Sequence, residues 1–142
     1  MEKVDQVTFN VRYAETDQMG RAYHAWYIVW FEMGRSSLFR NAGIPYSEFE
    51  KRGLFLPVRR VTAEYERPVH YDEQVTVRTR VKKVGPARIV FASEVITAKG
   101  ERACHGEVEL AVTDKCGKIV RWPKDLMDKI AAMSDGLEEA PR

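Results

Sequence analysis

The sequence predicts an α+β domain in which an antiparallel sheet of five or more strands is wrapped around one long helix. Two patterns lead to this prediction: a single long apolar helix in the first third of the chain, and a series of alternating strands after it. The chain has 142 residues, of which 44% are hydrophobic and 31% charged, as expected for one globular domain with a core. We therefore expect residues 1–142 to form one domain, with a polar tail at 134–142 that frays.

The first strand and the long helix are predicted from the first 43 residues. Residues 7–13 alternate apolar and polar side chains, which is typical of a half-buried strand. After a loop at 14–23 the pattern becomes helical from about residue 24 to 42, and Gly43 is suited to end the helix in the left-handed conformation. Residues 26–31 are apolar on almost every side. Such a helix has to be covered by other elements, so we expect the sheet to curl around it.

The rest of the chain consists mainly of strands separated by turns. A short polar segment at 47–52 comes first, and Pro123 opens a short final helix that reaches about Met133. Glycine-containing turns such as Gly85-Pro86 indicate that consecutive strands are antiparallel neighbours. The strands between these helical segments are expected near residues 61–66, 75–81, 89–95, 104–112 and 119–122.

The overall charge and the cysteines argue against several classes of function. A formal net charge of +2 is too small to predict nucleic-acid binding. No apolar stretch reaches the roughly 18 residues of a membrane span, and no apolar leader precedes the first strand, which favours a cytoplasmic protein. Cys104 and Cys116 are expected to be free thiols, one buried on a strand and one in a turn. The histidines lack metal-ligand spacing, so no metal site is predicted.

The loop before the long helix brings together a carboxylate, a glycine and a histidine: Asp17, Gly20 and His24. Aspartate is common in turns because its side chain accepts hydrogen bonds from backbone N–H groups two residues on. A helix N-terminus, however, offers unpaired backbone N–H groups and a partial positive charge. A carboxylate beside such a terminus is suited to attack a polarised carbonyl, so a structural and a catalytic role are both open for Asp17.

Two motifs carry a family resemblance. The first is Tyr13-x-x-Thr16-Asp17-x-x-Gly20-x-x-Tyr23-His24-Ala25-x-Tyr27, followed by Phe31-Glu32, and the second is Tyr65-Glu-Arg-Pro68-Val-x-Tyr71-Asp72. They resemble the hotdog-fold acyl-CoA thioesterases, in particular the 4-hydroxybenzoyl-CoA thioesterase group and its bacterial relatives of the Tol-Pal gene cluster. The resemblance covers residues 5–130 and implies a hotdog fold and hydrolysis of an acyl-CoA thioester to free acid and coenzyme A. It also implies a homodimer or homotetramer with its sites between subunits.

The resemblance implies roles for individual residues of the loop. Asp17 would be the catalytic carboxylate, acting either as nucleophile or as general base on water. The backbone N–H of His24, at the start of the helix, would polarise the thioester carbonyl. Tyrosines such as Tyr13 and Tyr23 are more often packing residues than catalytic ones, but Tyr13 ends the predicted first strand and could place its hydroxyl in the pocket. Gly20 and Tyr23 are expected to contribute to substrate binding in the same loop.

The nucleotide contacts implied by the resemblance involve fewer basic residues than in relatives. Lys83 and Arg88, on either side of the Gly85-Pro86 turn, would contact the nucleotide of coenzyme A. Coenzyme A is then part of the substrate, and neither a cofactor nor a metal is implied. The identity of the acyl group stays open, because a pocket lined by aromatic residues suits an aromatic, a short aliphatic or a longer chain.

Three alternatives also stay open. Glu32 corresponds to a helix glutamate that another hotdog branch uses as its catalytic carboxylate, but it precedes Arg35 by three residues, a spacing typical of a helix ion pair. A non-catalytic module that binds acyl-CoA or an acyl carrier would use the same cleft. A hotdog dehydratase would need a histidine paired with a helix acid, a role that His24 and Glu32 could fill.

Overall fold

A computed structural model describes residues 4–134 of the chain. In chain order its elements are β1 (Val4–Asn10), a short 3-10 helix (Tyr13–Glu15), α1 (His24–Asn41), α2 (Tyr46–Lys51), β2 (Val58–Tyr65), β3 (Gln74–Gly85), β4 (Arg88–Ile96), β5 (Arg102–Ala111) and α3 (Lys124–Met133). Apart from Ser134, the polar tail predicted at 134–142 lies outside the described residues.

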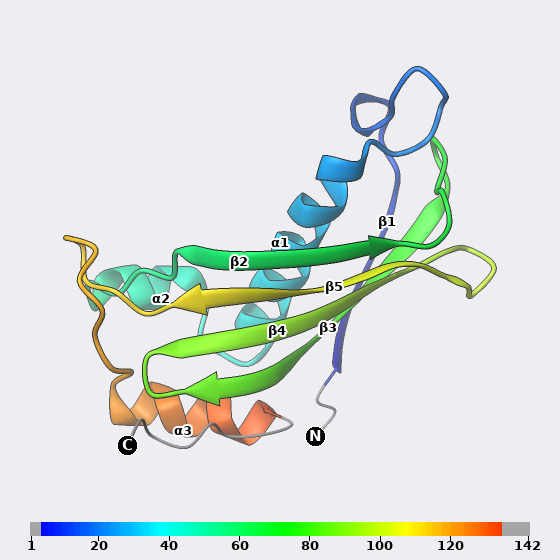
Figure 1. The fold of residues 1–142 in the computed structure, drawn as a ribbon. Coiled ribbons are helices and arrows are strands. Elements are labelled where there is room, and N and C mark those ends of the chain that lie inside the picture. The colour runs from blue at the N-terminus through cyan, green and yellow to red at the C-terminus, as the bar shows by residue number, and fades with distance from the viewer. Residues whose placement is uncertain (1–3, 135–142) are drawn as a thin grey trace.

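The five strands of the described chain form one antiparallel sheet in the order β1-β3-β4-β5-β2 (Figure 1). β3, β4 and β5 follow one another along the chain and pair as consecutive hairpins, whereas β1 and β2 are the edge strands. The predicted α+β class with an antiparallel sheet of five strands is confirmed. Because β1 pairs with the first half of β3, the loop after β1 lies at the end of the sheet where β3 begins.

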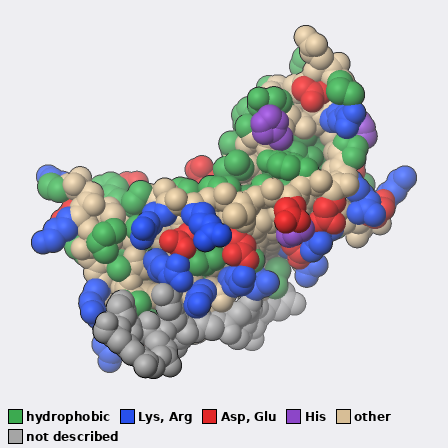
Figure 2. All heavy atoms as spheres, in the orientation of Figure 1, with side chains coloured by type: hydrophobic (Ala, Val, Ile, Leu, Met, Phe, Trp, Pro, Cys, Tyr) green, Lys and Arg blue, Asp and Glu red, His purple; other side chains and the backbone are tan. Residues whose placement is uncertain are grey.

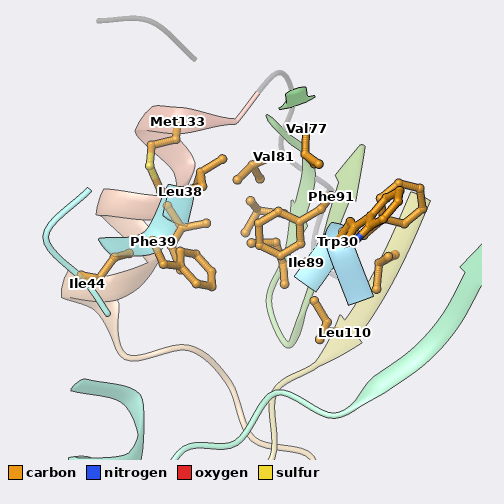
Figure 3. Packing of buried hydrophobic residues seen from close by; sticks show 14 of the residues in the cluster. Trp30, Leu38, Phe39, Ile44, Val77, Val81, Ile89, Phe91, Leu110 and Met133 are labelled. Atoms are coloured by element: carbon orange, nitrogen blue, oxygen red, sulfur yellow. The ribbon is translucent and has the colours of Figure 1, made fainter. Parts of the chain in front are cut away.

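The hydrophobic core lies between α1 and the face of the sheet that it contacts (Figure 3). Trp30, Phe31 and Phe39 of the helix are fully buried. Val77 of β3 and Phe91 of β4 are fully buried on the sheet side of the same cluster. Burying a side chain of this size contributes roughly 1.5–3 kcal/mol, so these contacts fix the helix on the sheet.

Gly34 allows α1 to approach β3 closely. A Cβ atom at this position would lie only 2.2 Å from Oγ1 of Thr79 and 3.1 Å from a methyl group of Val77. Beneath the helix the hydroxyl of Thr79 pairs with that of Ser93 at 3.3 Å, so these buried polar groups have a partner. The close contact fixes the height of α1 above the sheet, and with it the position of the first helical turn.

One side of α1 is exposed to solvent in the single chain. Ile28, Val29 and Met33 have exposed fractions of 39%, 41% and 37%. The expectation that the chain's own elements cover the first half of the helix on every side is therefore wrong, because the sheet covers one face and leaves the opposite one open. The helix itself is confirmed: it spans residues 24–41, and Gly43 after it has a φ of 81°.

Two predicted strand boundaries also differ from the structure. The first strand ends at Asn10 and does not reach Tyr13, because the chain turns there into the 3-10 helix. Residues 119–122 form no strand of the sheet. Ile119 makes one isolated bridge with Thr113, and the N–H groups that follow bond to loop carbonyls, so the ladder does not continue.

The thiols and the surface charges agree with the sequence-based picture. Cys104 is buried on β5 and Cys116 is exposed in a turn, both as free thiols, which confirms the prediction for this pair.

Figure 2 shows basic and acidic side chains intermixed over the strands, and neighbours pair there, as Arg88 and Glu109 do at 2.6 Å. Within residues 4–134, no helix is long and apolar enough to cross a membrane.

Candidate active site

The loop between β1 and α1 folds into a small hairpin held by its own backbone. The N–H of Asp17 donates to the carbonyl of Arg21 at 2.8 Å, and the N–H of Gly20 donates to the carbonyl of Asp17 at 3.1 Å. Gly20 has a φ of 77°, a conformation that glycine adopts without steric cost. The tight turn at Gly20 therefore returns the chain to α1 only a few residues after Asp17.

The Asp17 side chain takes part in the turn but leaves one oxygen free. Its Oδ1 accepts a hydrogen bond from the N–H of Met19 at 2.8 Å, which is the ordinary structural role of aspartate in a turn. Its Oδ2 has no hydrogen-bond partner within residues 4–134, and the residue is exposed. The structural role is thus observed, and it uses only one of the two carboxylate oxygens.

The first turn of α1 begins directly after the hairpin. Tyr23 is the N-cap residue, and its N–H donates to the carbonyl of Glu15 at 2.8 Å. The N–H of His24, the first helical residue, has no backbone partner in the described part of the chain. The rings of His24 and Tyr23 contact each other, with centroids 4.3 Å apart. An unpaired N–H and the positive end of the helix dipole therefore coincide at His24.

Asp17 and His24 line the same hollow, an open depression of about 430 Å³. Its other principal walls are the rings of Tyr27 and Tyr65 and the side chains of Arg21 and Arg67. The hollow lies where the hairpin, the start of α1 and the end of β2 meet. In Figure 2 hydrophobic side chains gather in this upper part of the molecule, where Figure 1 shows the loop and the beginning of α1.

Two tyrosines from different elements form the aromatic wall of this hollow. The hydroxyl of Tyr65, at the end of β2, donates to the backbone carbonyl of His24 at 3.0 Å, so the edge strand is tied to the first turn of α1. Its ring meets that of Tyr27 edge to face, with centroids 5.2 Å apart. Burial raises the pKa of Tyr27 to about 12 and that of Tyr65 above its usual value, so both phenols stay neutral near pH 7.

The two arginines in the hollow differ in their partners. Arg67 pairs with Glu101 at 3.0 Å and donates to the carbonyl of Arg102 at 3.2 Å. Arg21 contacts the sulfur of Met19 at 3.7 Å and has no carboxylate partner in the described part of the chain. The sequence analysis did not single out either arginine as a residue of the candidate site. Arg67 belongs to the second family motif, Tyr65-Glu-Arg-Pro68-Val-x-Tyr71-Asp72, and its place in that motif could have pointed to it.

A buried carboxylate lies directly behind the hairpin. Glu15 is 1% exposed, and its oxygens accept hydrogen bonds from the backbone N–H of Arg12 at 2.7 Å and from the indole N–H of Trp30 at 2.8 Å. Burial raises the pKa of this carboxyl, but the hydrogen bonds from Trp30 and Arg12 outweigh it and hold the pKa below its usual range. The sequence analysis did not single out Glu15.

Five predicted site residues do not line the hollow: Gly20 and Tyr23 lie next to lining residues in the loop and at the N-cap of α1, whereas Tyr13, Lys83 and Arg88 lie away from it. Tyr13 is 78% exposed and contacts the ring of Tyr71, with centroids 5.7 Å apart. Lys83 and Arg88 line a separate depression of about 220 Å³, which shares no lining residue with the first. Lys83 lies toward the far end of β3, roughly 30 Å from its beginning at about 3.3 Å per residue, and Arg88 opens β4 opposite Gly85 at the same end. A single chain therefore does not bring these three residues together with Asp17.

The expected ion pair on α1 is absent among the described residues. Glu32 is exposed, whereas Arg35 is buried with an exposed fraction of 5%, and the Nε of Arg35 has no hydrogen-bond partner within residues 4–134. The prediction of a Glu32–Arg35 pair is wrong, because the two side chains lie on different sides of the helix despite their spacing. Glu32 does not line the hollow that contains Asp17 and His24.

The fold defines a class of proteins. A five-stranded antiparallel sheet with a long helix on one face is shared with solved structures of thioesterases, so the chain has the fold of the hotdog thioesterases. Residues 11–130 match the family model described as the thioesterase-like superfamily, and the chain belongs to this family.

Similar proteins carry related names. A putative acyl-CoA thioesterase of Bacillus subtilis (strain 168), YneP, is 40% identical over 69% of this chain and 71% of its own length. The acyl-CoA thioester hydrolase YbgC of Escherichia coli O157:H7 is 25% identical over 73% of this chain and 78% of its own length. The crystal structure of a DHNA-CoA thioesterase from Staphylococcus aureus is 32% identical, with a TM-score of 0.87, covering 91% of this chain and 89% of that one. The predicted family and enzyme class are confirmed, whereas the Tol-Pal association stays a prediction.

Proposed function

We propose that this chain hydrolyses an acyl-CoA thioester with Asp17 as the catalytic carboxylate. The observation that carries the proposal is the shared hollow, which is lined both by Asp17, with one carboxylate oxygen outside its turn hydrogen bond, and by His24 at the first turn of α1. The names of the family relatives support the reaction class.

Two routes use the same geometry. In the first, Oδ2 of Asp17 attacks the thioester carbon, the C–S bond breaks, and coenzyme A leaves as the thiolate; water then cleaves the mixed anhydride to free acid and regenerates the carboxylate. In the second, Asp17 takes a proton from a water molecule that attacks the same carbon. In both, negative charge develops on the thioester oxygen, and the unpaired N–H of His24 would stabilise it.

The walls of the hollow favour an aromatic acyl group. Tyr65, which is 47% exposed, and the largely buried Tyr27 behind it line the hollow together with Asp17, and their neutral phenols place no negative charge against the acyl chain. A related structure is that of a thioesterase for DHNA-CoA. We therefore expect aromatic acyl-CoA thioesters to be hydrolysed with a higher kcat/KM than aliphatic ones of equal size.

We also propose that a second copy of the chain completes the site, as a hotdog homodimer. The exposed apolar side chains Ile28, Val29 and Met33 lie in the second and third turns of α1, and β2 is an edge strand that pairs only with β5 within residues 4–134. A second copy would cover these side chains and would bring a distant depression, such as that at Lys83 and Arg88, toward the Asp17 of its partner. Light scattering at micromolar concentration is expected to give at least twice the chain mass, and Val29→Glu to lower it; a monomer mass for the wild type would contradict the assembly.

The catalytic assignment is tested with two matched carboxylate substitutions. Asp17→Asn keeps the shape and the bond to Met19 but removes the charge, so hydrolysis of the best acyl-CoA should fall at least about 10²-fold in kcat with KM little changed. Glu32→Gln, at an exposed carboxylate outside the hollow, should be nearly neutral in rate.

The outcomes separate the alternatives. If Glu32→Gln abolished turnover while Asp17→Asn left it intact, the carboxylate assignment would be wrong, and the branch that uses a helix glutamate would replace it. Binding of coenzyme A without hydrolysis of any acyl-CoA, across aromatic, short and long acyl groups, would favour the non-catalytic module.

A further inference from the structure

We propose that Glu15 is a positioning residue, which fixes the hairpin that carries Asp17 against α1 through its buried carboxylate. This inference rests on the proposed function, because it gives Glu15 a role only if Asp17 is the catalytic carboxylate. Glu15 itself would not touch the substrate, since it is 1% exposed and does not line the hollow.

The Glu15 carboxylate connects the two elements on either side of the hairpin. One oxygen, Oε1, accepts the backbone N–H of Arg12, the N-cap residue of the 3-10 helix after β1, at 2.7 Å, and the Arg12 guanidinium lies 3.3 Å from Oε2. The same Oε2 accepts the indole N–H of Trp30, in the second turn of α1, at 2.8 Å. The start of the 3-10 helix, the hairpin and α1 are thus joined at a single buried group.

The backbone of Glu15 adds a fourth contact at the other end of the hairpin. Its carbonyl accepts the N–H of Tyr23, the N-cap residue of α1, at 2.8 Å. The segment between Glu15 and Tyr23, which contains Asp17 and Gly20, is therefore closed at its base by one residue. Asp17 itself is exposed and bonded only within its own turn, so its direction relative to the helix depends on the contacts that hold the hairpin. Among the described residues these are the contacts of Glu15 and the backbone bonds of Ala22 to Val69 and of Gly20 to Tyr71, of which only those of Glu15 reach α1.

The arrangement requires a carboxylate and not merely a polar side chain. Both oxygens of Glu15 face N–H donors, one from Arg12 and one from Trp30. An ionised carboxylate accepts at both oxygens, whereas an amide has one oxygen and one NH₂ group, which would then oppose a donor. Glutamine at this position would leave one buried donor without an acceptor, and the hairpin or the indole would have to move.

A small displacement is enough to affect the reaction. Misplacing a catalytic group by about 1 Å can cost on the order of 10²-fold in rate, because the attacking atom must reach the carbonyl along a defined line. The proposed walls of the acyl site, Tyr27 and Tyr65, make no hydrogen bond to Glu15 among the described residues, although the ring of Tyr27 packs on that of Trp30 with centroids 4.8 Å apart. A loss of positioning should therefore appear in kcat and leave KM nearly unchanged.

The test compares Glu15→Gln with Trp30→Phe on the best acyl-CoA substrate. We expect kcat to fall about 10- to 100-fold in Glu15→Gln and about 3- to 10-fold in Trp30→Phe, with KM within about threefold of the wild type. Since both substitutions remove the same hydrogen bond, the double variant should lose less than the product of the two single losses. Leu126→Ala serves as the control: Leu126 is fully buried in α3, far from the hairpin (Figure 1), so it should lower the melting temperature and keep kcat.

Nuclear magnetic resonance provides a readout that does not depend on turnover. In Glu15→Gln the indole N–H resonance of Trp30 should shift upfield, because the charge-assisted bond is lost, and the amide resonance of Met19, which reports the Asp17 turn, should shift or broaden. Leu126→Ala should leave both resonances in place.

Each outcome has a defined meaning. Unchanged kcat in folded Glu15→Gln and Trp30→Phe, or an unmoved Met19 amide, would overturn the positioning role. If Glu15→Gln did not fold, Trp30→Phe would carry the same test through kcat, KM and the Met19 amide. If the wild type hydrolysed no acyl-CoA, the proposed function would fail, while the resonances would still decide whether Glu15 holds the hairpin.

Discussion

The contact at Gly34 leads to a quantitative prediction for Gly34→Ala. The added Cβ would lie 2.2 Å from Oγ1 of Thr79, about 1 Å inside ordinary van der Waals contact, so α1 and β3 must separate or Thr79 must rotate. Overpacking of this kind costs about 1–3 kcal/mol, and loss of the Thr79–Ser93 hydrogen bond about 1 kcal/mol. The higher helix propensity of alanine offsets about 1 kcal/mol of this destabilisation.

The net destabilisation expected for Gly34→Ala is therefore about 1–3 kcal/mol. For a chain of this length that corresponds to a fall of roughly 3–10 °C in melting temperature, measured by circular dichroism. Thr79→Ala should cost about 1 kcal/mol by itself, and combined with Gly34→Ala it should recover part of the loss, since the clashing oxygen is gone. A melting temperature of Gly34→Ala equal to or above that of the wild type would refute the close approach of helix and sheet.

Two further predictions concern the titratable groups. Burial raises the pKa of Cys104 to about 12, so a thiol reagent at pH 8 should modify only Cys116 in the folded protein and both thiols after denaturation; rapid modification of both in the native state would contradict this burial. Because the hydrogen bonds of Glu15 hold its pKa below the ordinary value of 4.5, their stabilisation is complete above that pH and is lost as the pH falls below it. The melting temperature of the wild type should therefore decline more steeply than that of Glu15→Gln between pH 6 and pH 3.

The parts of the fold that the sequence predicted well are those with a long, regular pattern. The helix at 24–41 begins and ends where the pattern and Gly43 place it, and β3, β4 and β5 follow their alternating residues closely. These patterns are reliable because a helix or strand with one side toward the core repeats its apolar residues with the period of that element, about 3.6 residues for a helix and about 2 for a strand. Gly20 was predictable for a similar reason, since a loop that turns tightly before a helix needs a left-handed residue.

The errors arose where a pattern depends on a partner distant in the sequence. The bond of Glu15 to the Arg12 N–H is local, but its second partner, the indole of Trp30, comes fifteen residues later, and nothing in the sequence around Glu15 indicates that this ring will meet it. Glu32 and Arg35 have the spacing of an ion pair, but Arg35 turns toward the interior. The apolar residues all around the start of α1 predicted complete coverage, which the single chain does not provide.

The strands that we expect to pair first during folding are not the strands that carry the candidate site. β3, β4 and β5 pair with their neighbours in sequence, so this meander closes only short loops, whereas β1 and β2 join it across long stretches of chain. The hairpin with Asp17 follows β1, and the Tyr65 wall ends β2, so the candidate site is built on the two strands expected to dock last. Substitutions in these two regions should accelerate unfolding and hardly slow refolding. The candidate site can therefore diverge toward new substrates, while the central strands β3, β4 and β5 still allow the chain to fold.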